Sequence, residues 1–159
     1  MTDPTGSPAG PSGGRADHPD AGRYFALDPS LAAAGEGAYV DYERDVEAVE
    51  MVSGLAFRPV VGERFMVNFV RYEPNTDAPR HAHEEEQITF VIDGEFEFDL
   101  DGDVRTMRRG TAVVVPPGVP HGARTLDTTC FEIDVFDPPR RVLLEMMRAR
   151  SEGGPEEAT

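Results

Sequence analysis

The sequence predicts an all-β domain, built as a sandwich or a barrel, and three observations support this prediction. Short apolar stretches rich in Val, Ile and Phe recur along the middle of the chain at lengths typical of strands. Turn-forming pairs such as Asp93-Gly94 and Asp101-Gly102 separate several of these stretches. Helical periodicity is convincing only near the C-terminal end. Many short strands with tight turns are typical of all-β architectures.

The chain of 159 residues fits a single domain, which we place at residues 38–150. Residues 1–37 begin with a long run of Pro, Gly, Ser, Ala and Asp, and we expect them to be disordered or loosely ordered. They carry too few large apolar side chains to offset the entropy of ordering. Residues 151–159 are rich in Gly and Glu and predict a second disordered tail.

The composition excludes several classes of partner. A formal net charge of −15 argues against binding nucleic acid or an anionic membrane surface, because both require clustered Lys and Arg. Apolar runs of the roughly 20 residues that span a membrane do not occur. A single cysteine allows no internal disulfide and suits a reducing compartment. We therefore expect a cytoplasmic protein.

The strands are predicted in three groups along the chain. The first group covers 46–52, 55–61 and 64–73, and the break at Val61-Gly62-Glu63 is expected to supply the positive-φ residue of a tight hairpin. The second group covers 87–92, 95–100 and 104–107, where Asp93-Gly94 and Asp101-Gly102 supply the positive-φ residues of tight hairpins. The third group covers 111–115, 121–125 and 130–136.

One helix is predicted after the last strand. Asp137 can cap it and Pro138 suits its first position. An apolar stripe follows, formed by Val142, Leu143, Met146 and Met147. We expect this stripe to pack on the barrel or on a partner subunit.

Three histidines and one glutamine are spaced for a metal site. His81 and His83 point to the same face of an extended segment, because side chains of a strand alternate, and Gln87 follows at an even step. A turn-rich run then delivers His121 at the start of a predicted strand. Three imidazoles and one amide oxygen could meet on one divalent ion. These ligands suit Zn, Fe, Mn, Ni or Cu, so the metal stays open.

The spacing of these residues resembles the two motifs of the cupin superfamily. The first motif is met by His81, His83 and Gly94, with Gln87 where the family has Glu and Asn75 in place of the leading Gly. Asn tolerates the left-handed backbone that this Gly adopts. The second motif is met by Gly110, Pro116, Gly118 and His121, with Thr125 in the Asn position. The resemblance implies a jelly-roll barrel, a homodimer and one divalent metal per chain.

Replacing Glu by Gln changes the expected chemistry of the site. Four neutral ligands leave the ion its full charge, so it would be a stronger Lewis acid toward an anionic oxygen or enolate. The neighbouring Glu84, Glu85 and Glu86 are expected to form a solvated loop, although one of them could replace Gln87 as a ligand.

The segment from Asp134 to Arg140 resembles the tail of small cupins that convert unsaturated uronates to linear keto sugars. The resemblance implies that Asp134 is a general base, that Phe136 is a pocket wall and that Arg140 binds a substrate carboxylate or enolate. The alternative is a structural ion pair between Asp134 and Arg140. Further substrate-binding candidates are Arg80, Arg124 and Asn68. The two arginines could instead form ion pairs with nearby acidic residues, and Asn68 could instead be a hydrogen-bonded amide in the core.

These features predict a metal-dependent enzyme that moves a proton on a small carbonyl or enol substrate, anionic or enolic in character. Isomerisation, cyclisation and lyase chemistry all fit, and the resemblance includes aromatic polyketide cyclases. Two alternatives stay open. With Fe(II) or Cu the same site would suit a dioxygenase, and a barrel that only binds a small molecule would need no catalysis.

Overall fold

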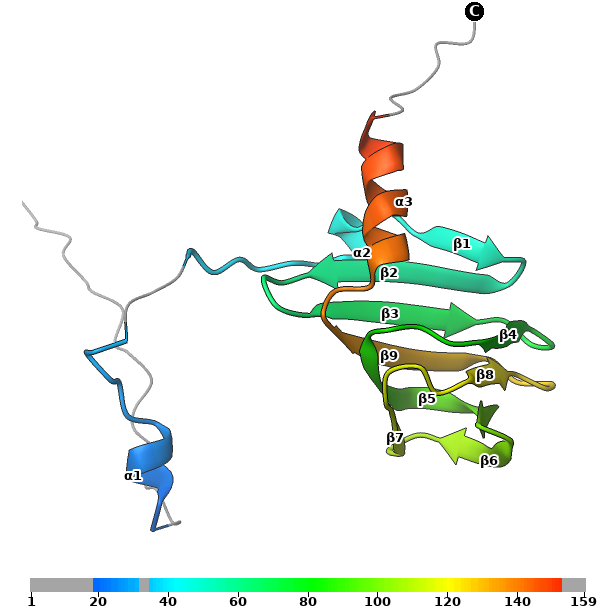
Figure 1. Ribbon diagram of the computed structural model, residues 1–159, viewed down its shortest axis with the longest axis horizontal. Helices are drawn as coiled ribbons and strands as arrows, with labels where there is room; N and C mark the ends of the chain where they lie inside the picture. Colours follow the sequence, from blue (N-terminus) through cyan, green and yellow to red (C-terminus); the bar gives the residue numbers. More distant parts are fainter. Residues whose placement is uncertain (1–18, 32–34, 153–159) are drawn as a thin grey trace, which may run out of the picture. The chain divides into compact units, whose positions relative to one another are not determined.

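The computed structural model describes residues 19–31 and 35–152 (Figure 1). The chain divides into two units, residues 1–38 and residues 39–159. The described part of the first unit contains one short helix, α1 (Ala21–Tyr24). Most of the two predicted tails, namely residues 1–18, 32–34 and 153–159, lies outside the described residues. Within the described ranges, none of the helices is long and apolar enough to cross a membrane.

The second unit is a nearly closed antiparallel barrel, which confirms the predicted all-β fold (Figure 1). Its strands lie in the order β1-β2-β3-β9-β5-β8-β4, with β6 and β7 also paired to β5. The strands are β1 (Val49–Val52), β2 (Leu55–Val61), β3 (Met66–Tyr72), β4 (Asp77–His81), β5 (Glu86–Leu100), β6 (Asp103–Arg108), β7 (Ala112–Val115), β8 (His121–Arg124) and β9 (Cys130–Asp137).

β5 joins the two sheets of the barrel because its two halves have different neighbours. The first half pairs with β9 and β7, and the second half pairs with β6 and β8. The ladder with β9 shifts register between Val91 and Asp93, next to Gly94 with φ 74°. A Cβ on Gly94 would lie 2.1 Å from the carbonyl oxygen of Thr129, so only glycine fits. The predicted hairpin at Asp93-Gly94 is therefore wrong, and the strand continues through an irregularity.

The other two predicted turns are confirmed. Asp101 and Gly102 join β5 to β6 with φ of 52° and 92°, as a two-residue hairpin requires. The turn after Val61 joins β2 to β3 and is closed by the N–H of Gly62, which donates to the carbonyl of Phe65 at 2.9 Å. Gly62 is not among the glycines with positive φ, contrary to the expectation for this turn.

β4 was absent from the predicted strands. Four of its five residues are exposed and Pro79 interrupts the pattern, so the segment carries no buried alternation. It pairs with β8 at the end of the strand order, where an exposed strand is tolerated. A short helix, α2 (Tyr42–Asp45), was also not predicted, and it is capped by the side chain of Asp41.

Helix α3 (Arg141–Glu152) packs on the barrel, as one of the two predicted arrangements required. Its buried Leu143 contacts Met66 and Phe136. The predicted start is wrong, because Asp137 pairs with Glu86 as the last residue of β9 and so is not a helix cap. Pro138 accordingly precedes the helix and is not its first residue. The helix is capped instead by the side chain of Glu85, which accepts a hydrogen bond from the backbone N–H of Arg141.

The inner faces of β3 and β9 carry polar side chains into the barrel. Along each strand alternate residues are buried, and the buried set on β9 includes Glu132 and Asp134. Asn68 of β3 lies directly opposite Asp134 in the ladder. The remaining core is apolar, with Leu55, Val70, Phe96, Phe98 and Val115 among its buried members. The polar groups therefore lie inside a mostly apolar barrel.

Candidate metal centre and cavity

Three histidines from separate segments meet in the second unit. His81 ends β4 and His121 begins β8, and the two are directly paired in register. His83 lies in the connection between β4 and β5. Ligand nitrogens of the three rings lie within 4.8 Å of one another. The structure thus brings together the three imidazoles that the sequence spacing selected.

The backbone fixes the same tautomer in all three rings. Each Nδ1 lies 2.8 to 2.9 Å from a backbone carbonyl oxygen, the oxygens being those of Pro79, Glu85 and Val119. A carbonyl oxygen only accepts, so Nδ1 must carry the proton and donate it. Each Nε2 is then left with a lone pair, which is the arrangement that metal-binding histidines use.

The amide of Gln87 is oriented with its oxygen toward the histidines. Its Nε2 donates to Thr89 Oγ1 and to Asp134 Oδ1, both at 2.8 Å. Its Oε1 lies 3.0 Å from His83 Nε2. In the tautomer fixed by the backbone, these two atoms face each other with lone pairs only. A cation between or beside them would relieve that conflict.

Burial favours the neutral forms of His83 and His121. It lowers the pKa of His121 to about 4, with the neighbouring histidines and Arg140 lowering it further. Burial and the charge of Arg140 also lower the pKa of His83. The Nε2 of His121 is buried with no hydrogen-bond partner among the described residues. A buried, unprotonated nitrogen with no partner fits a metal ligand, so the residues present suit a divalent transition metal.

Asp134 lies next to this donor set. Its Oδ1 accepts hydrogen bonds from Gln87 and from Thr89 Oγ1, the latter at 2.5 Å. Burial raises the pKa of the Asp134 carboxyl to about 6, although the two hydrogen bonds lower it in part. A carboxyl with this pKa exchanges its proton near neutral pH. The structure thus places a titrating carboxyl one hydrogen bond away from the proposed metal ligand Gln87.

Arg140 is paired with Glu85, not with Asp134. Its Nη1 lies 3.0 Å from Glu85 Oε2, and the other oxygen of Glu85 accepts from the backbone N–H of Arg141 at 3.0 Å. Glu85 therefore caps the N-terminus of α3. Burial by itself would raise the pKa of Glu85, but the hydrogen bond from Arg141 and the charge of Arg140 hold it below its ordinary value. The alternative of an Asp134–Arg140 ion pair is wrong.

A cavity of about 290 Å³ connects these groups. His81, Gln87 and His121 line it together with Asp134 and Arg140. Phe136 also lines it, with its ring centroid 5.7 Å from that of His83. Most of the remaining wall is apolar, including Met51, Leu55, Phe57, Phe98 and Leu143. The cavity can therefore hold a small, largely apolar molecule beside the histidines.

The inner wall of the cavity carries three more polar side chains, Asn68, Tyr72 and Glu132. All three are at least 96% buried. Burial raises the pKa of Glu132 well above its ordinary value, with the negative charge of Asp134 adding to the effect. Burial likewise raises the pKa of Tyr72, whose hydroxyl is hydrogen-bonded to Glu132. This wall therefore favours neutral forms of both groups.

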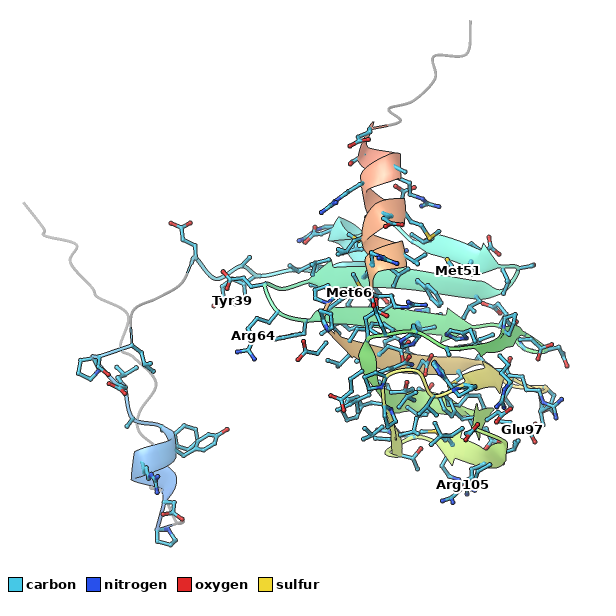
Figure 2. All side chains as sticks on the ribbon, in the orientation of Figure 1. Tyr39, Met51, Arg64, Met66, Glu97 and Arg105 are labelled. Atoms are coloured by element: carbon cyan, nitrogen blue, oxygen red, sulfur yellow. The ribbon has the colours of Figure 1, made fainter. Side chains whose placement is uncertain are left out.

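Arg80 and Arg124 are not brought to the cavity. Arg80 pairs with Asp99 at 2.7 Å, and Arg124 pairs with Glu97 at 2.6 Å. Both arginines line a different and more open surface hollow. Figure 2 shows Glu97 near β6, whereas Met51 of the cavity wall lies on β1. These two arginines form ion pairs with nearby acidic residues, as the alternative to substrate binding predicted.

Three residues of the site were missed from the sequence. Glu132 had a usable signal, since it shares the buried face of β9 with Asp134 and Phe136. Tyr72 could have been placed by the same alternation on β3. The expectation of a solvated loop is wrong for Glu85, which is 2% exposed and pairs with Arg140, 55 residues away in the sequence.

Comparisons with known proteins agree with this geometry. Residues 68–135 match the family model described as the cupin domain. Over 64 residues the chain is 38% identical to the H2HPP isomerase of Bacillus subtilis, a match covering 39% of this chain. The match spans only 27% of the length of that isomerase.

Two solved structures are similar over most of the barrel. KdgF from Halomonas sp. has a TM-score of 0.62 and 26% identity, covering 69% of this chain and 99% of that one. The polyketide cyclase RemF from Streptomyces resistomycificus has a TM-score of 0.58 and 27% identity, covering 64% of this chain and 80% of that one. The antiparallel barrel, the histidine cluster at its predicted spacing and these matches show that residues 68–135 carry a cupin domain.

Proposed function

We propose that this protein is a divalent-metal-dependent enzyme that transfers a proton on a small carbonyl or enol substrate. Isomerisation, cyclisation and lyase reactions share that step. Among the similar proteins are an isomerase and a polyketide cyclase, which supports this class of chemistry. The observation that carries the proposal is the position of Asp134, a buried carboxyl with a pKa of about 6, hydrogen-bonded to Gln87 beside the three histidines.

The proposed metal ligands are the Nε2 atoms of His81, His83 and His121 and the Oε1 of Gln87. When bound there, a divalent ion supplies a Lewis acid that stabilises negative charge on a substrate oxygen. Imidazole and amide donors are compatible with several transition metals, so the proposal covers Zn, Mn, Ni and Fe.

Asp134 acts as the base in this proposal. Both hydrogen bonds from Gln87 and Thr89 end on Oδ1, so neither of them engages Oδ2. The Oδ2 atom takes the proton from the carbon next to the substrate carbonyl and returns it at a second position. Arg140 uses one nitrogen for Glu85 and has further N–H groups with which to hold a substrate carboxylate. Phe136 closes one side of the cavity and excludes water from the transfer.

Proton exchange tests this proposal directly. We expect the metal-loaded protein to accelerate the exchange of the C3 protons of enolisable 2-oxo acids, such as phenylpyruvate, with D₂O. Asp134→Asn should lower the exchange rate by about 10²- to 10⁴-fold while keeping the metal. Arg124→Gln, on the outer surface, is the control and should leave the rate unchanged. Full activity of Asp134→Asn, or uptake of dioxygen with substrate, would contradict the proposal and favour binding alone or the dioxygenase.

The proposal includes a homodimer. A row of aliphatic side chains crosses the outer face of the sheet, each directly paired with the next: Val60, Val67, Val135, Ile88 and Val114. Phe90 beside this row is 41% exposed and Val114 is 52% exposed. A continuous apolar face of this kind favours a partner surface. The cytoplasmic location expected from the sequence also stays a prediction.

A further inference from the structure

The inner wall of the cavity holds two polar atoms for which the proposed proton transfer has no use. These are Asn68 Oδ1 and Glu132 Oε2, both buried and without a hydrogen-bond partner among the described residues. Asn68 is 1% exposed and Glu132 is 3% exposed, and both line the cavity. A buried polar atom without a partner is unfavourable, and native proteins rarely leave one unsatisfied. Because both residues line the same cavity, we infer that a ligand group there completes these two atoms.

The two residues are close enough to share one ligand group. Asn68 lies opposite Asp134 in the β3–β9 ladder, and Glu132 lies opposite Val70. Asn68 and Glu132 are therefore diagonal neighbours on the inner face, with backbones roughly 7–8 Å apart. Glu132 is also two residues from Asp134 on β9, which corresponds to about 7 Å along the strand. The shared ligand group would therefore lie about 7 Å from the reacting carbon, which is placed beside Asp134.

The chemistry of the wall selects a neutral hydroxyl. The amide oxygen of Asn68 only accepts, so its partner must donate. The carboxyl of Glu132, which is hydrogen-bonded to Tyr72, favours its neutral form. A neutral carboxyl can donate or accept a hydrogen bond. An anionic group at this wall would meet the carboxyl groups of Glu132 and Asp134, and neither carboxyl pairs with a cation among the described residues. Arg140 pairs with Glu85 instead. A hydroxyl can donate to one atom and accept from the other.

We propose that Asn68 and Glu132 bind a neutral hydroxyl group of the substrate, carried on an apolar ring about 7 Å from the carbon that exchanges its proton. The ring would lie against the apolar walls formed by Leu55, Phe57 and Phe98. The location of the reacting carbon rests on the proposed function. The substrate class is thus a hydroxylated cyclic or aromatic carbonyl compound, and not a fully hydroxylated sugar acid.

A matched pair of probes tests this assignment. Phenylpyruvate and 4-hydroxyphenylpyruvate are both enolisable 2-oxo acids and differ only in a hydroxyl at the far end of the ring. We expect the full-length, Zn²⁺-loaded protein to bind 4-hydroxyphenylpyruvate at least about 10-fold more tightly by calorimetric titration, since an unmatched buried polar pair disfavours the other probe. Asn68→Leu and Glu132→Met should each bring the ratio of the two dissociation constants to about 1. The control Arg124→Gln should keep the wild-type ratio.

The results separate this inference from the proposed function. A ratio near 1 in the wild-type protein, or binding of neither probe, overturns the inference, because the wall is then satisfied by water. A preference that survives both substitutions overturns the assignment to these residues. The proposed function is tested separately by proton exchange of phenylpyruvate, which lacks the hydroxyl and should still exchange in Asn68→Leu and Glu132→Met. If one variant fails to fold, as judged by circular dichroism and zinc content, the other carries the test alone.

Discussion

Gln87 links the proposed metal ligands to the proposed base, Asp134. Its amide nitrogen donates to Asp134, which leaves its oxygen facing His83. A glutamate at this position would have no N–H to donate and would place a second carboxylate against Asp134. The amide therefore allows a carboxylate base to lie next to the ligand set, in addition to leaving the proposed ligands uncharged.

Thr89 offers a test of Asp134 as the base. The carboxylate form of Asp134 accepts the proton, so the exchange rate should rise with pH through the pKa of this group, about 6. The hydrogen bond from Thr89 lowers that pKa, so Thr89→Val should raise it and shift the half-maximal rate to higher pH. The pH–rate profile of phenylpyruvate exchange measures the shift. Thr111→Val, at an exposed position, is the control, and an unchanged profile in Thr89→Val would contradict the assignment.

Spacing along the chain predicted which residues cluster, and pairing between distant strands decided their contacts. His81, His83, Gln87 and His121 could be selected because their separations follow the alternation of a strand and a known motif. The partner of Arg140 could not be selected, since its nearest carboxylate along the chain is not its nearest in space. Only the folded chain shows that Glu85 takes that place.

At the scale of elements, the connection before β5 links the histidine cluster to α3. His83 Nδ1 donates a hydrogen bond to the backbone carbonyl oxygen of Glu85. The side-chain carboxylate of Glu85 caps α3 and pairs with Arg140. The start of α3 is thus fixed by a residue of the site. The predicted cap at Asp137 is wrong, because Asp137 pairs with Glu86 as the last residue of β9.

Neutralising Glu85 should destabilise the protein strongly. We expect Glu85→Gln to lower the free energy of unfolding by about 3 kcal/mol, because it leaves Arg140 partly buried without its counter-charge. The pKa of Glu85 is lowered on folding, so this stabilisation is present above its ordinary pKa and is lost as pH falls through the lowered value. Urea denaturation at pH 7 measures the difference. Glu84→Gln, the exposed neighbour, should change it by less than about 0.5 kcal/mol, and equal effects would contradict this role.

The course of β5 shows where sequence patterns fail for an element. Asp93-Gly94 has the composition of a hairpin turn, and the same composition at Asp101-Gly102 does form one. The difference is tertiary, since Gly94 lies against the backbone of Thr129 and its strand remains paired on both sides. A local pattern cannot report that contact.

At the scale of the whole molecule, the outer row of aliphatic side chains sets the expected assembly. We expect sedimentation equilibrium to give twice the chain mass of 17.4 kDa. Val135→Arg, in the middle of the row, should produce a monomer because it places a charge in the buried contact. Val104→Arg on β6, at a position that is 56% exposed, is the control and should stay dimeric. A monomeric wild-type protein would contradict the assembly.

Metal content tests the central claim most directly. The account predicts about one divalent transition-metal ion per chain by elemental analysis, in protein purified without added metal or chelator. It predicts the loss of that ion in His121→Ala, because the Nε2 of His121 is buried and has no hydrogen-bond partner in the described part of the chain. It predicts that Arg124→Gln retains the ion. A wild-type protein that binds no metal even after incubation with Zn²⁺, Mn²⁺, Ni²⁺ and Fe²⁺ would contradict the account and leave a barrel that only binds a small molecule.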